Sequence, residues 1–85
     1  MIRNANPAGV EFLRVEVETA STFARIASDA QDSEKRLRNV QNARRGYDTL
    51  LHFMGTLPLS QEERAEMHTK VSELRVRLIN LGENV

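Results

Sequence analysis

The residues of this chain best suited to catalysis or metal binding are His52, His68 and a scatter of serines. A carboxylate-bridged two-metal site in a helical bundle needs Glu-x-x-His pairs, and no glutamate precedes either histidine by three positions. The chain has no cysteine, which removes thiolate catalysis, disulfides and cysteine-ligated zinc or iron–sulfur sites. It also has no glycine-rich phosphate loop, no His-Glu-x-x-His run and no serine nucleophile motif. We therefore expect no enzymatic activity, no cofactor, no metal site and no small-molecule substrate.

Binding of a charged partner is the next chemistry to consider, because charge is unevenly distributed along the chain. The 12 basic and 12 acidic residues cancel overall. Residues 33–59 are net basic, whereas the segments before and after them are net acidic. Attraction between segments that pack against one another is the simplest explanation. The alternative is a basic patch that binds a nucleic acid or an acidic partner, made of Lys35, Arg38, Asn42 and Arg45.

The first element that would position such residues is an unusually apolar helix. Between residues 10 and 30 an apolar seam repeats at spacings of three and four, as on one face of a helix. Its members are Val10, Leu13, Val17, Ala20, Ala24 and Ala27. A second apolar stripe beside it contains Phe12, Val15, Phe23, Ile26 and Ala30. Together they cover roughly 220° of the helix, where a surface helix usually needs little more than about 100°. This helix is therefore expected to touch several neighbours.

Two further amphipathic segments complete the predicted fold. The helices are expected at about residues 7–29, 33–54 and 60–81, within a single helical domain over residues 1–85. Helices of similar length joined by short connectors predict an all-α, antiparallel three-helix (up-down-up) bundle, with dimerisation as a further expectation. No glycine or proline enforces the first turn, so one continuous helix over residues 9–54, dimerising as a long hairpin with the last helix, is the alternative.

Capping residues mark the predicted helix boundaries. Asn6, just before a proline, suits the N-cap of the first helix, and Asp32 or Ser33 suits that of the second. Ser60 and Glu63 have the spacing of a capping box at the start of the third helix. Gly82 follows the last apolar residue of that helix, where a C-terminal cap glycine is typical.

The apolar seams of the three helices predict a shared core. Its expected members are Leu13, Val17, Ala20, Ala24, Leu37, Val40, Tyr47, Leu51, Val71, Leu74 and Leu78. The apolar residues left over predict a protein interface made of Phe12, Val15, Phe23, Ile26, Phe53, Val76 and Ile79. Gly46 falls off the core seam and is expected on a partly exposed face, with close approach of a partner as the alternative. Phe53 is expected either to cover the following turn or to anchor a partner.

These observations favour a small helical interaction or structural module that acts through contacts with another protein or through a homodimer. The alternative is a binder of nucleic acid or of an acidic partner through the basic face of the second helix. The first seven residues lack the apolar core of a signal peptide, and no apolar run approaches membrane-spanning length. We therefore expect a cytoplasmic protein with no membrane partner.

Overall fold

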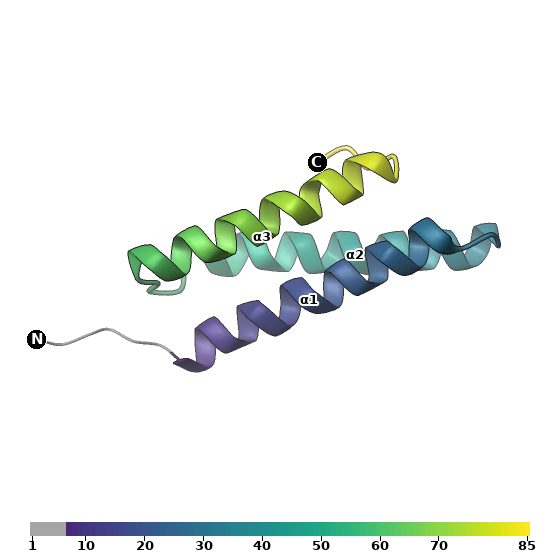
Figure 1. Ribbon diagram of the computed structural model, residues 1–85. Helices are drawn as coiled ribbons and strands as arrows, with labels where there is room; N and C mark the ends of the chain where they lie inside the picture. Colours follow the sequence, from purple (N-terminus) through teal and green to yellow (C-terminus); the bar gives the residue numbers. More distant parts are fainter. Residues whose placement is uncertain (1–6) are drawn as a thin grey trace, which may run out of the picture.

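The computed structural model describes residues 7–85, which form three helices that run up, down and up (Figure 1). Helix α1 spans Pro7–Asp29, α2 spans Ser33–Met54 and α3 spans Gln61–Asn80. This is the predicted all-α three-helix bundle, so the predicted fold class is confirmed. The chain leaves the helical conformation at residues 30–32, so the alternative of one continuous helix over residues 9–54 is wrong.

Capping residues fix where α2 and α3 begin and where α3 ends. The Asp32 side chain accepts a hydrogen bond from the backbone N–H three residues later, at 2.8 Å. Ser60 and Glu63 form the predicted capping box, in which each side chain accepts a hydrogen bond from the backbone N–H of the other residue. Gly82 adopts a φ of 96° just beyond α3, a conformation that favours glycine at a helix end. The predicted cap at Asn6 lies outside the described residues.

The core lies where the three helices meet. Every member of the predicted α1 seam is buried. Helix α3 contributes a narrow seam of four buried side chains, Met67, Val71, Leu74 and Leu78. The largest fully buried side chains are Leu13, Leu50, Met67, Leu74 and Leu78. Helices α1 and α2 share the most extensive interface, and α3 packs on one side of that pair. Within residues 7–85, no third helix packs on the other side of the pair.

Two predicted core residues, Leu37 and Leu51, are 58% and 48% exposed, so their predicted burial is wrong. Helix α2 instead buries Asn39, Gly46 and Leu50 beside the rest of its seam. The buried arc of α2 is turned toward α1, because α2 packs more extensively on α1 than on α3. Leu37 and Leu51 lie at the edge of that arc.

Gly46 allows a close approach between α1 and α2. It is buried, so the prediction that it lies on a partly exposed face is wrong. A Cβ atom placed on Gly46 would stand only 2.8 Å from the Cβ atom of Ala20, closer than two such atoms pack. The close neighbour is thus α1 of the same chain. With a hydrogen on one helix and a methyl group on the other, the two backbones approach closely at this point.

Candidate functional site

Two stripes of side chains border the side of the α1/α2 pair that lies away from α3. The α1 stripe consists of Phe12, Val15, Thr19, Phe23 and Ile26. The α2 stripe consists of Lys35, Arg38, Asn42, Arg45, Thr49 and Phe53. Within each stripe the residues recur at spacings of three and four, which places them along one face of their helix. We call the two stripes and the groove between them the open face.

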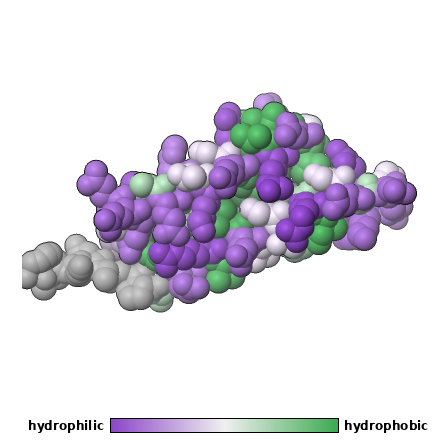
Figure 2. Space-filling view, in the orientation of Figure 1, coloured by the Kyte–Doolittle hydropathy of each residue, from purple (hydrophilic) through white to green (hydrophobic). Residues whose placement is uncertain are grey.

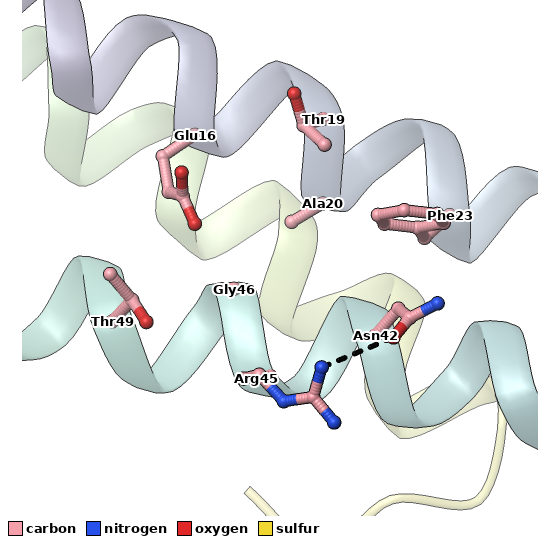
Figure 3. A pocket seen from close by; sticks show the side chains of 8 residues that line it. All are labelled: Glu16, Thr19, Ala20, Phe23, Asn42, Arg45, Gly46 and Thr49. Atoms are coloured by element: carbon pink, nitrogen blue, oxygen red, sulfur yellow. Dashed lines mark hydrogen bonds between the residues drawn. The ribbon is translucent and has the colours of Figure 1, made fainter.

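A depression of about 280 Å³ lies at the middle of the open face. Figure 3 shows the side chains around it, with α3 passing behind the α1/α2 pair. Helix α1 contributes Glu16, Thr19, Ala20 and Phe23 to the lining, and α2 contributes Asn42, Arg45, Gly46 and Thr49. A guanidinium N–H of Arg45 donates a hydrogen bond to Asn42 Oδ1 at 3.4 Å. The depression therefore has small residues where the helices approach, an aromatic ring on one wall and polar groups at its rim.

One end of the open face is aromatic. The rings of Phe12 and Phe53 meet edge to face with 5.3 Å between their centroids, and the His52 ring meets Phe53 at 4.8 Å. Phe12 is 40% exposed and Val15 is 52% exposed, whereas Phe53 is half-buried and packs against the core. Phe53 thus covers the end of the core and also joins Phe12 at the surface.

Basic side chains of the α2 stripe extend from the opposite end of the open face to its middle. Lys35, Arg38 and Arg45 are exposed, and none of them forms an ion pair with a carboxylate of residues 7–85. Lys35 lies in the first turn of α2, where the positive end of the helix dipole disfavours a positive side chain. The charge on the α2 stripe is therefore not neutralised by the described part of the chain.

The ion pairs between helices involve other residues. Arg14 of α1 donates two hydrogen bonds to the Glu66 carboxylate of α3, each at 2.9 Å. These hydrogen bonds lower the pKa of Glu66 and raise the pKa of Arg14. Hydrogen bonds to Glu83 and Asp48 raise the pKa of Arg44 in the same way. Salt bridges of the bundle therefore hold α3 and the C-terminal segment, while the basic side chains of the α2 stripe take no part in them.

The structure brings together on the open face two residue sets that the sequence treated as alternatives. Five of the predicted interface residues and all four of the predicted basic patch lie along its two stripes. Sequence periodicity describes each helix by itself, so it could not show that both sets border one groove. The depression lined by Phe23, Asn42 and Arg45 was missed for the same reason.

The remaining predicted interface residues, Val76 and Ile79, lie on α3 and are 55% and 44% exposed. They do not join the residues that line the depression. The face turned to the viewer in Figure 2 is mostly hydrophilic, with an apolar area over the C-terminal part of α3. Val76 therefore provides an exposed valine away from the open face, for comparison with Val15.

The groove between α1 and α3 has a different character. Its depression, about 260 Å³, is lined mostly by charged side chains, among them Arg14, Glu73 and Arg77. Within residues 7–85, no three His, Cys, Asp or Glu side chains gather as ligands of a metal ion would. None of the helices in the described part of the chain combines the length and the apolar character needed to cross a bilayer. Comparison of the chain with protein-family models, with curated proteins and with solved structures finds no match.

Proposed function

We propose that this protein is a small helical binding module whose open face receives another protein. The observation that carries the proposal is that Phe12 and Val15 stay 40% and 52% exposed beside a bundle core that is already formed. Neighbouring large apolar side chains left in water are typical of interaction sites. Phe12 and Val15 also border a groove with a central depression, which Val76 and Ile79 on α3 do not. Each of Phe12 and Val15 is about half-exposed, so covering it would contribute about 1 kcal/mol. The whole α1 stripe would therefore offset part of the entropy lost on association.

A second candidate function is binding of a nucleic acid through the α2 stripe. The absence of an ion pair at Lys35, Arg38 and Arg45 within the described residues favours it. Phosphates on the α2 stripe would nevertheless leave the apolar α1 stripe in water. A protein partner covers both stripes at once, so it accounts for more of the open face.

Val15 and Val76 provide a matched pair for the test, because both are helix-surface valines, 52% and 55% exposed. A photo-crosslinking residue is placed at either position in cells that produce the protein, and the adducts are identified by mass spectrometry. We expect a defined protein adduct from position 15 and none from position 76.

The captured protein is then purified and titrated with the full chain. We expect Val15→Asp to weaken this binding at least about tenfold, because a charge would enter the covered apolar stripe, and Val76→Asp to leave it unchanged. An adduct with a second copy of the chain would identify self-association as the interaction. Equal effects of the two substitutions would contradict the proposal.

A further inference from the structure

We infer that the occupant of the open face is an acidic amphipathic helix of a different chain, an inference that rests on the proposed function. The open face places an apolar stripe beside a stripe with three basic side chains, Lys35, Arg38 and Arg45. Neither stripe contains a carboxylate, and the Glu16 carboxylate lies between them, at the central depression. A partner that covers both stripes must therefore bring apolar side chains for one and negative charge for the other.

The two ends of the open face differ in chemistry. Phe12, in the second turn of α1, meets Phe53, in the last turn of α2, and Gly46 meets α1 near its middle. Because the two helices are antiparallel, Lys35 and Arg38 in the first turns of α2 lie beside the last turns of α1. The face is thus aromatic at one end and basic at the other. The partner's acidic residues are therefore expected toward one end of its length, while its apolar residues follow the whole α1 stripe as far as Ile26.

A helix suits this groove better than an extended peptide. The groove lies between two helices, whose backbone N–H and C=O groups are bonded within each helix. An extended peptide would bury backbone groups without partners there, whereas a helix satisfies its own. Packed helices lie about 8–10 Å apart, so a further helix can rest on both stripes. The central depression of about 280 Å³ has room for one of its large apolar side chains.

A second copy of the chain fits the open face poorly. A two-fold dimer places the same surface on both sides of the interface. With the two-fold axis along the helices, the basic ends of the two copies come together. With the axis across the helices, the basic end of one copy covers the aromatic end of the other. Neither arrangement places a carboxylate of the stripes against Lys35 or Arg38, and the Glu16 carboxylate lies at the central depression of the groove.

The test uses a displayed library of amphipathic helical peptides about 20 residues long, enough to span the face at 1.5 Å per residue. Apolar positions hold Leu, Ile or Phe, and flanking positions sample Glu, Lys and Gln equally. The library is selected on the full chain. Binders are then compared on Val15→Asp, on Val76→Asp and on the double variant Lys35→Glu/Arg38→Glu. In the double variant, Lys35→Glu puts a negative side chain at the positive end of the α2 dipole, so the chain is expected to stay folded. Urea unfolding checks this.

We expect the selected peptides to be enriched in Glu, with the acidic positions clustered in one half. Their binding should weaken about tenfold on Lys35→Glu/Arg38→Glu and with rising salt concentration. Peptides with Lys in place of Glu should recover binding to that double variant, which a merely structural effect of the substitutions would not produce.

Other outcomes overturn the inference in distinguishable ways. Peptides that need Val15 but show no preference for Glu would overturn it and leave the proposed function standing. Dimerisation of the chain that Val15→Asp abolishes would make a second copy the occupant. Failure to select any peptide that depends on Val15 would count against both the inference and the proposed function. Binding of a duplex oligonucleotide that requires Lys35 and Arg38 but not Val15 would also count against both the inference and the proposed function.

Discussion

The contact between Gly46 and Ala20 determines how closely α1 and α2 approach at the centre of the open face. In an isolated helix, alanine would be more stable than glycine at position 46 by about 0.8–1 kcal/mol. In the bundle, the added methyl group would stand 2.8 Å from the Ala20 Cβ atom, which cannot rotate away. Glycine at position 46 therefore makes α2 by itself less stable than alanine would, but it allows α2 to pack closely against α1.

We expect Gly46→Ala to lower the free energy of unfolding. Overpacking typically costs about 1–3 kcal/mol, which outweighs the gain in helix propensity. Urea unfolding of the full chain measures the change. In an Ala20→Gly background the same substitution should cost less, because the opposing methyl group is gone. A stabilising Gly46→Ala would contradict the close approach.

At the scale of single helices, the sequence predicts the helix ends that depend on hydrogen bonds between residues close together in the chain. Asp32 and Ser60 cap their helices through hydrogen bonds to residues three positions away, so short segments were sufficient to place these ends. The rotation of α2 is not local, because it follows from how extensively α2 packs on each neighbour. The apolar periodicity of the segment therefore placed Leu37 and Leu51 within the predicted core arc of α2. The same arc left Gly46 outside the predicted core, because Gly46 falls off the apolar seam.

Helix α3 depends on its narrow seam for its attachment. Leu74 is fully buried, whereas Val76 two residues later is 55% exposed. We expect Leu74→Ala to lower the free energy of unfolding by about 2–5 kcal/mol, because it removes buried methyl groups and leaves a cavity. Val76→Ala should stay within about 0.5 kcal/mol of the parent chain. Similar urea midpoints for the two variants would contradict the assignment of the seam.

The Arg14–Glu66 ion pair between α1 and α3 predicts a pH dependence. The Arg14 hydrogen bonds lower the pKa of Glu66 in the folded chain, so the pair stabilises the fold at neutral pH. That contribution is lost as the pH falls through the lowered pKa, below the ordinary range of a glutamate. Glu66→Gln should therefore be less stable than the parent chain at neutral pH, and the difference should shrink in acid. If the urea midpoints of Glu66→Gln and the parent chain differ by the same amount at neutral and at acidic pH, the ion pair does not have this role.

At the scale of the whole molecule, the three helices of residues 7–85 leave one side of the α1/α2 pair without a neighbour from that part of the chain. The sequence predicted the surplus of apolar residues on α1 and the basic residues on α2. It could not predict that they share a groove, because that depends on which faces of the two helices meet. A chain this small buries only about 60–65% of the surface that it exposes when unfolded. A partner on the open face would therefore add appreciably to its stability.

The chemistry of the open face predicts that the chain by itself is a monomer, with Phe12 and Val15 in water until a partner arrives. Its Tm should then be the same at about 10 µM and about 300 µM, whereas mass action would raise the Tm of a dimer by several degrees over that range. Val15→Asp should leave the Tm of the isolated chain nearly unchanged, because residue 15 is 52% exposed. Scanning calorimetry at both concentrations, with sedimentation equilibrium alongside, makes the measurement. A Tm that rises with concentration in the parent chain but not in Val15→Asp would show that a second copy covers the open face.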